Sequence, residues 1–441
     1  MDAATSIFLG LVLLLISSTL AFKLQRVDGP SVIMCAVWGS ILISYGLANS
    51  IFYSIQIETL ATIFAAALAF GLGGIVRHLL PYENKRINIV AHPFLFHSTI
   101  IWIILLTLAL PIYYKTIVGD YQLNEDVNIF AAIRIISLQE EKNVQGFSLV
   151  RNLLPISFIL PIATYFSLGE KRTFSHKFAF GLAIFIALLY GLLTGSKGVV
   201  PGLAIAMCLA KIIKSNGVFR GSGVGYILFF GLFGVFAMMR IFNFAFDDGK
   251  SEIEVWGASV RTVLAYSTAP INSFDLYLRN PEYLDVSGQH LSRPFIYMTN
   301  SVLQLFGYKQ YQNLVPLHLP FTDPGPDFET AAINTYTYLI SYVSTFGRPL
   351  AFVALFLLGS AVSLIHKLAV GGDLIWMIFY CYISRAFTLC FGGDYLILDF
   401  PNEIRALIAT SIVIYLTPAI IYYINRFYTL ALYRLPAQIQ N

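Results

Sequence analysis

The chain has 441 residues, of which 57% are hydrophobic and 12% are charged, and its formal net charge is +4. Soluble domains carry about 25% charged residues, so this composition excludes a cytosolic globular enzyme. The abundant apolar side chains also exclude a disordered chain. The four cysteines lie in apolar runs without metal-ligand spacing, which indicates inert buried thiols. We therefore expect an all-α integral membrane protein.

A helix needs roughly 20 apolar residues to cross a bilayer. The expected spans are the eleven apolar runs at residues 5–22, 30–48, 57–76, 94–114, 150–168, 177–194, 198–213, 223–242, 349–367, 373–391 and 405–425. The first run is followed by no signal-peptidase site and is expected to remain as a span. Two segments, 115–148 and 243–347, are too polar to span. The chain is thus expected to divide into residues 1–242 with eight spans, a large outer loop at 243–347, and residues 348–441 with three spans.

The basic residues indicate the orientation of the spans, because cytoplasmic loops are rich in lysine and arginine. Alternate connections hold 14 basic and 4 acidic residues, a net charge of +10, whereas the rest of the chain has a net charge of −6. The loop at 243–347 holds 5 basic and 10 acidic residues. We therefore expect this loop and the N-terminus to lie outside the cytoplasm, and the C-terminus to lie inside it.

Both outer segments contain helical patterns. Residues 128–142 are typical of an amphipathic helix on the membrane surface, or equally of an ordinary connecting helix. In the long loop we expect helices at 252–266, 268–285, 291–306 and 328–344, the last capped by Asp327, and an extended proline-rich stretch at 314–327. An ordered loop of this length is usually functional, so it is predicted to be a partly helical lid or a substrate-binding cap.

One arginine lies well inside an expected span. Placing Arg385 in hydrocarbon costs about 2.5–3.5 kcal/mol on insertion scales, so the residue requires a water-filled cavity or an acidic partner. The nearest candidates in the sequence are Asp394, Asp399 and Glu403. Arginines at the ends of spans, such as Arg405, can instead extend their side chains to the headgroups.

A second cationic feature is the short outer turn at 194–198 (Thr-Gly-Ser-Lys-Gly), which precedes the seventh span. Backbone N–H groups at a helix start, together with the ammonium of Lys197, form a typical anion site at the height of a lipid pyrophosphate. The alternative is a tight turn with a lysine that reaches the headgroups.

Signatures of soluble enzymes are missing from the sequence. There is no G-x-G-x-x-G, H-E-x-x-H, paired-cysteine or G-x-S-x-G motif, and no D-x-D stands at the outer start of a span. We therefore expect no metal, no other cofactor and no nucleic-acid partner. The long loop contains two histidines, His290 and His318, and either is a candidate proton acceptor or a hydrogen-bonded loop residue.

Three segments carry a resemblance to a known family: residues 194–198, residues 265–274 (Ala-Tyr-Ser-Thr-Ala-Pro-Ile-Asn-Ser-Phe), and residues 334–338 (Asn-Thr-Tyr-Thr-Tyr) with Phe346-Gly347 after them. With these segments and the architecture of most of the chain, the sequence resembles the Wzy family of bacterial O-antigen polymerases. The family commonly has an arginine where Lys197 stands, and an Asp-Phe-Gly where this chain has Thr345 before Phe346.

The resemblance implies a metal-independent glycosyltransferase of lipopolysaccharide biosynthesis in the bacterial inner membrane, with its active site facing the periplasm. It would transfer a growing glycan from undecaprenyl pyrophosphate to another lipid-linked repeat unit. Implied protein partners are a flippase and a chain-length regulator. The chemistry needs cations for the departing pyrophosphate, a base for the acceptor hydroxyl, and a groove that orients both substrates.

Each of these needs has candidate residues in the sequence. The expected pyrophosphate ligands are Lys197, Arg240, Arg261, Arg293 and Arg385. The expected glycan contacts are Tyr266, Asn272, Asn334 and Tyr336. Arg261 and His290 are the expected catalytic residues, with a carboxylate of the loop as an alternative base. The functions left open are a ligase that moves finished glycan to lipid A core, a lipid-linked oligosaccharide flippase, and a non-catalytic scaffold.

Overall fold

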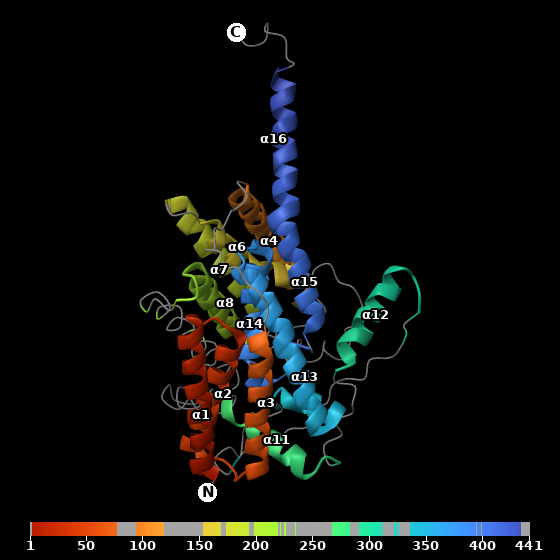
Figure 1. Ribbon diagram of the computed structural model, residues 1–441. Coiled ribbons are helices and arrows are strands. Elements are labelled where there is room, and N and C mark those ends of the chain that lie inside the picture. The colour runs from red at the N-terminus through yellow and green to blue at the C-terminus, as the bar shows by residue number, and fades with distance from the viewer. Residues whose placement is uncertain are drawn as a thin grey trace, which may run out of the picture.

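The computed structural model describes residues 2–76, 94–118, 153–168, 173–193, 198–218, 267–282, 291–309, 336–393, 395–397 and 399–433, with single residues between these ranges. Over these ranges the regular secondary structure is entirely helical (Figure 1). The helices of the first half are α1 (Asp2–Leu24), α2 (Pro30–Leu47), α3 (Ile57–Ile75), α4 (Leu95–Val118), α6 (Leu153–Ser167), α7 (Phe174–Leu192) and α8 (Val199–Lys214). Those of the second half are α11 (Pro270–Arg279), α12 (Arg293–Leu305), α13 (Leu339–Val370), α14 (Leu374–Thr388), α15 (Phe400–Ser411) and α16 (Thr417–Tyr433).

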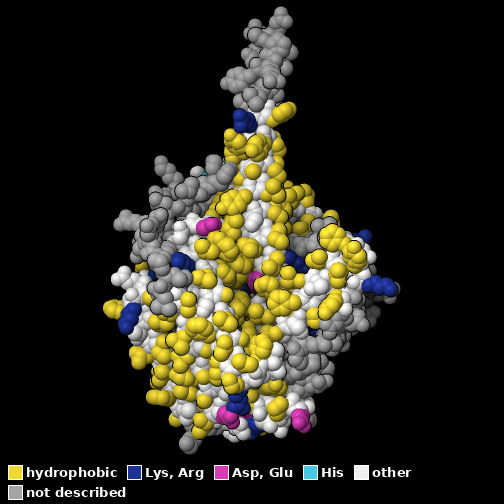
Figure 2. All heavy atoms as spheres, turned by 45° about the vertical axis from the view of Figure 1, so that its right-hand side comes forward, with side chains coloured by type: hydrophobic (Ala, Val, Ile, Leu, Met, Phe, Trp, Pro, Cys, Tyr) yellow, Lys and Arg dark blue, Asp and Glu magenta, His cyan; other side chains and the backbone are white. Residues whose placement is uncertain are grey.

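In the part of the chain that the structure describes, seven helices are long and apolar enough to cross a membrane. They are α1, α2, α3, α4, α7, α13 and the continuous helix that contains α15 and α16. Figure 2 shows a largely hydrophobic face with few charged side chains, as expected where lipid covers the protein. The protein is therefore an all-helical, multi-pass membrane protein. The expected span at 223–242 lies almost entirely outside the described residues, so the count of eleven stays a prediction.

Small residues allow the longest helices to pack closely. A Cβ atom on Gly73 of α3 would collide with the carbonyl oxygen of Phe356, and one on Gly359 of α13 would collide with the carbonyl oxygen of Phe70. Within a bilayer the association of helices depends on such close packing, because lipid is as apolar as the side chains. Replacement of either glycine would therefore push α3 and α13 apart.

Helix α13 differs from the two helices predicted for this part of the chain, at 328–344 and 349–367. The expected helix 328–344 is wrong at 336–338, which are not helical, because the N–H of Tyr338 bonds the carbonyl oxygen of Cys390 instead of a helical carbonyl. The helix then continues through the expected start of the ninth span. It bends at Gly347, whose φ of 70° belongs to the left-handed region that favours glycine.

Two helices predicted in the long loop are confirmed in position. Helix α11 is shorter than the expected 268–285, because Pro281 cannot donate to a helical carbonyl and disfavours a helical residue before it. Helix α12 agrees with the expected 291–306 within two residues. Figure 1 shows α12 beside the bundle and α11 beneath it, close to α3.

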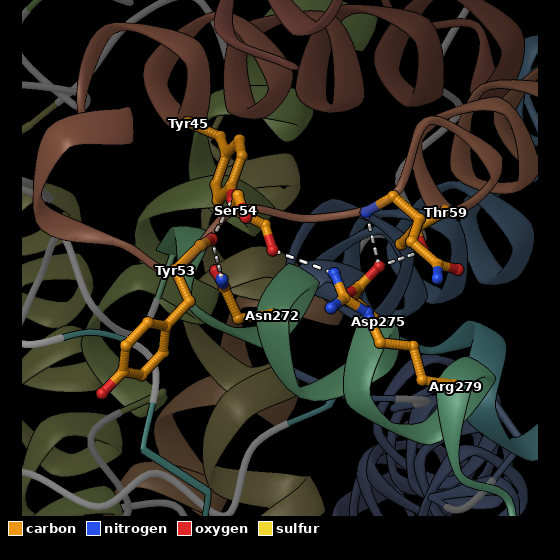
Figure 3. Close-up of polar contacts among 8 residues, drawn as sticks. Tyr45, Tyr53, Ser54, Thr59, Asn272, Asp275 and Arg279 are labelled. Atoms are coloured by element: carbon orange, nitrogen blue, oxygen red, sulfur yellow. Dashed lines mark hydrogen bonds and ion pairs between the residues drawn. The ribbon is translucent and has the colours of Figure 1, made fainter. Parts of the chain in front are cut away.

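Polar contacts hold α11 against the connection between α2 and α3 (Figure 3). The Asn272 amide donates to the carbonyl oxygen of Tyr53 at 2.8 Å. The Asp275 carboxylate accepts the backbone N–H of Gln56 at 2.9 Å and also the hydroxyl of Thr59. This carboxylate lies at the start of α3, where the helix dipole favours negative charge. The loop is thus fixed on the spans by directed bonds.

A second polar cluster lies at the other end of α2, in the turn between α1 and α2. The Arg26 guanidinium donates two hydrogen bonds to the Asp28 carboxylate, at 2.9 and 2.7 Å. Nε2 of His366, near the end of α13, lies 3.2 Å from the same carboxylate, and both of these side chains are fully buried. The N–H of Val27 bonds the carbonyl oxygen of Gly217, just after α8.

These two clusters lie at opposite ends of α2. The connections after α1 and α8, both expected inside, meet near Asp28, together with His366 near the end of α13. The long loop and the connection between α2 and α3, both expected outside, meet at α11. The compartment that each end faces stays a prediction.

The last helices form one continuous rod that rises beyond the bundle in Figure 1. Between α15 and α16 the residues Ile412–Leu416 adopt a π-helix, which accommodates one extra residue in a turn. The first turn of α15 lies beside α14, where Glu403 faces Arg385.

Candidate functional site

The candidate site is centred on Arg385, one turn before the end of α14. Its guanidinium donates a 2.9 Å hydrogen bond to the Tyr382 hydroxyl and lies 4.4 Å from the centre of the Tyr382 ring. The Phe158 ring of α6 lies 6.0 Å away, and the aliphatic stem passes Gly202 of α8. The side chain is 22% exposed. Helices α6, α8 and α14 thus pack around a guanidinium that stays partly exposed.

Two carboxylates from the start of α15 face this guanidinium. Glu403 Oε1 lies 3.4 Å and Asp399 Oδ2 lies 4.0 Å from Nη2 of Arg385. The two acids are four residues apart and so share one face of the helix. Asp394, the third expected partner, lies outside the described residues. One cation therefore faces two acids, in a region where water is scarce.

Hydrogen bonding in this cluster is incomplete. Among the described residues, the buried atoms Arg385 Nε and Glu403 Oε2 have no hydrogen-bond partner. The Glu403 side chain is only 4% exposed, whereas that of Asp399 is 35% exposed. Leaving a buried donor or acceptor unsatisfied costs about 1–3 kcal/mol, and more when the group is charged. The cluster thus retains one unpaired donor and one unpaired acceptor in the described structure.

The start of α8 lies close to Arg385. Gly202, which the stem of Arg385 touches, donates its N–H to the carbonyl oxygen of Gly198 one turn earlier. Gly198 is the last residue of the turn at 194–198 that was expected to bind an anion. One helical turn rises about 5.4 Å. The positive end of α8 therefore lies within about two turns' length of the guanidinium.

Another arginine lies on the opposite face of α15. Arg405 donates to the side-chain oxygen of Asn402 at 2.9 Å and to the Tyr297 hydroxyl of α12 at 3.1 Å. The Phe295 ring of α12 also packs against Phe400. Residues two apart in a helix point about 200° apart. Helix α15 therefore separates the Arg405 contact from the cluster around Glu403.

The structure places some of the expected site residues and leaves others untested. Those outside the described residues are Lys197, Arg240, Arg261, Tyr266, His290 and Asn334. Arg293 begins α12, the helix whose Tyr297 accepts a hydrogen bond from Arg405. Convergence of the five expected pyrophosphate ligands therefore stays a prediction.

Two expected glycan contacts are described and buried. Asn272 uses its amide to hold α11 to Tyr53, and only 8% of the residue is exposed. Tyr336 precedes α13 in a buried position, and burial raises the pKa of its hydroxyl. Asn272 thus helps to hold the loop on the spans, and a direct contact of either residue with sugar stays a prediction.

Several residues of the cluster were not among the expected site residues. Asp399 and Glu403 were expected only as partners of Arg385, and Tyr382 was not singled out. Their spacings of four and three residues along helices were the available signal. Among the described residues, no three potential metal ligands come together. Comparisons with protein families, curated proteins and solved structures found no match to this chain.

Proposed function

We propose that this protein is an integral-membrane glycosyltransferase that joins lipid-linked oligosaccharide units, with undecaprenyl pyrophosphate as the leaving group. The observation that carries the proposal is the partly exposed Arg385 guanidinium, which lies among the spans beside two carboxylates and close to the start of α8. The resemblance of residues 194–198, 265–274 and 334–338 to Wzy polymerases supports the same activity.

The site offers the chemical groups that this transfer needs. A guanidinium and a helix start favour the negative charge that develops on the departing pyrophosphate. A carboxylate accepts the proton of the acceptor hydroxyl. The long loop, fixed on the spans through α11, would orient the two glycans over the site. Its place would be the periplasmic face of a bacterial inner membrane, with a flippase supplying substrate and a chain-length regulator beside it.

A second candidate is a proton-coupled flippase for the same lipid-linked substrate. It is favoured by the excess of carboxylates over cations at Arg385, since carboxylates in spans commonly carry protons in transporters. It is weakened by the lack of a visible repeat in the sequence, because many transporter folds consist of two similar halves.

Surface polysaccharide from cells that lack this protein tests the proposal. A lost polymerase leaves lipid A core with one repeat unit, whereas a lost flippase or ligase leaves core alone. The wild-type gene should restore a full ladder on a gel. Core alone in the deletion strain would overturn the polymerase.

Orientation requires a separate measurement. A cysteine at Glu282, exposed after α11, should react with an impermeant thiol reagent in intact cells with a permeabilised outer membrane. A cysteine at Lys23, exposed at the end of α1, is the matched control and should react only after lysis. The four native cysteines are buried, so the background is low. The opposite labelling pattern would reverse the orientation.

A further inference from the structure

The unsatisfied atoms at Arg385 indicate which ligand group the cluster accepts. Arg385 Nε–H is a donor and Glu403 Oε2 is an acceptor, and both are buried without a partner among the described residues. An added anion would accept a hydrogen bond from Arg385 Nε–H, but Glu403 would repel it. An added cation would be attracted to Glu403 Oε2, but Arg385 would repel it. A hydroxyl can accept from Nε–H and donate to Oε2 at the same time.

We propose that Glu403 is the catalytic base of the transfer and that this position holds the acceptor hydroxyl of the incoming sugar. The inference rests on the proposed function and assigns to Glu403 the role for which the sequence offered His290 or a carboxylate of the long loop. The opening beside Arg385 and Asp399, whose side chains are 22% and 35% exposed, is the route by which the hydroxyl enters.

The chemical step follows from this arrangement. The hydroxyl proton moves to Glu403 Oε2 while the acceptor oxygen forms its bond to the anomeric carbon of the donor glycan. The bond between that carbon and the pyrophosphate oxygen breaks, and its electron pair leaves with undecaprenyl pyrophosphate. The Arg385 guanidinium and the start of α8 stabilise the negative charge that develops on the departing pyrophosphate.

Glu403 fits the role of base better than Asp399 does. Glu403 is the more buried, with 4% of its side chain exposed against 35% for Asp399, and its Oε2 has no hydrogen-bond partner among the described residues. A buried carboxylate is less hydrated and a hydrogen bond to it is electrostatically stronger. Among the described residues, the titratable groups that face Glu403 are Arg385 and Tyr382 from α14 and Asp399 from its own helix. Phe158 of α6 and Gly202 of α8 add no charge.

In this arrangement Asp399 has a supporting role. One guanidinium between two carboxylates cannot fully neutralise both. Asp399, exposed to water, shares the charge of Arg385 and leaves Glu403 more ready to accept a proton. Loss of Asp399 should therefore weaken the base without removing it.

The test uses the full chain in lipid nanodiscs with a lipid-linked repeat unit as donor and acceptor. We expect Glu403→Gln to lower kcat at least about 100-fold, the usual contribution of a general base, with KM changed less than about threefold. The acid limb of the pH–rate profile should disappear in this variant. Glu403→Asp should keep the limb at a reduced rate, and Asp399→Asn should keep it with a loss below about tenfold.

Controls separate the base from a structural role. Glu58→Gln, on the exposed pair with Arg348, should leave the rate and the profile unchanged. Equal melting temperatures of wild type and Glu403→Gln would show that the variant folds. If Glu403→Gln does not fold, the rate and the acid limb of Glu403→Asp test the proposal instead. An acid limb retained in Glu403→Gln at a rate within about threefold of wild type would overturn the base and leave the polymerase intact. Wild-type protein that extends no glycan would overturn both.

Discussion

The Tyr380 hydroxyl donates a 2.6 Å hydrogen bond to the main-chain oxygen of Asp28, 352 residues earlier in the chain. The bond joins the middle of α14 to the turn between α1 and α2. The carboxylate of the same aspartate lies between Arg26 and His366, and the His366 ring lies 4.6 Å from that of Tyr380. This turn therefore fixes the first two spans against the last third of the chain.

Replacement of Asp28 should destabilise the whole bundle. Asp28→Asn keeps the shape but leaves Arg26 and His366 without a charged partner. Removal of one member of a buried ion pair costs about 3–5 kcal/mol. We expect a clearly lower melting temperature for the purified protein in detergent. Asp373→Asn, which changes an exposed aspartate before α14, is the control and should melt within about 2 °C of wild type.

The same pair should give the stability a specific pH dependence. Burial alone would raise the pKa of Asp28, but the charges and hydrogen bonds of His366 and Arg26 hold this pKa well below its usual range. The contribution is therefore present above the unfolded pKa of about 3.9 and is lost as pH falls toward the folded value. The difference in melting temperature between wild type and Asp28→Asn should narrow below about pH 4. A constant gap from pH 7 to pH 3 would contradict this account.

Loss of Asp275 should loosen the start of α3 and release α11. Asp275→Ala leaves the N–H of Gln56 and the hydroxyl of Thr59 without their acceptor and removes the ion pair with Arg279. An unsatisfied donor costs about 1–3 kcal/mol. Amide exchange in the first turn of α3 should accelerate by roughly tenfold or more. Glu282→Ala, which removes an exposed acid just after α11, should leave these amides protected.

Arg405 is predicted to bind the pyrophosphate of the acceptor lipid, because α15 separates it from the cluster at which the donor's pyrophosphate departs. Its hydrogen-bond partners among the described residues, Asn402 and Tyr297, are neutral, so neither cancels its charge. A guanidinium can bind phosphate oxygens in a bidentate way that an ammonium cannot reproduce. Arg405→Lys should raise KM for the lipid-linked acceptor roughly tenfold, with kcat changed less than about threefold. Arg348→Lys is the control, and an equal effect there would indicate a general loss of positive charge.

Helix α12 is predicted to lie in the bilayer interface. Phe295, Val302 and Phe306 recur on one exposed side, whereas Asn300 faces inward and accepts the N–H of Tyr311. No charge occurs between Arg293 and Lys309, and such a helix suits the membrane surface. An environment-sensitive fluorophore on Val302→Cys in nanodiscs should be quenched by brominated lipid. The same label on Glu282→Cys should be quenched by aqueous iodide instead.

Seven of the expected spans correspond to described helices that are long and apolar enough to cross a membrane, because lipid imposes a simple rule on length and polarity. The cost of a charge inside a span predicted a water-filled cavity or a partner for Arg385, and two of the three candidate partners, Asp399 and Glu403, lie beside it. It could not predict the contact of Asp28 with His366 and Tyr380, because hydropathy does not reveal which spans are neighbours. The non-helical residues 336–338 were missed for a related reason, since Tyr338 bonds Cys390 of another segment.

The π-helix between α15 and α16 changes how the last helical rod presents its faces. One additional residue in a turn rotates everything after it by about 100° relative to an uninterrupted α-helix. The residues of α16 that would lie in line with Asp399 and Glu403 in an uninterrupted α-helix are therefore rotated away from that line. A cysteine scan from 400 to 427 should show two waves of lipid accessibility that are out of phase on either side of 412–416. Substitutions on the lipid-facing surface of α16 should therefore leave the contacts of Asp399 and Glu403 with Arg385 intact.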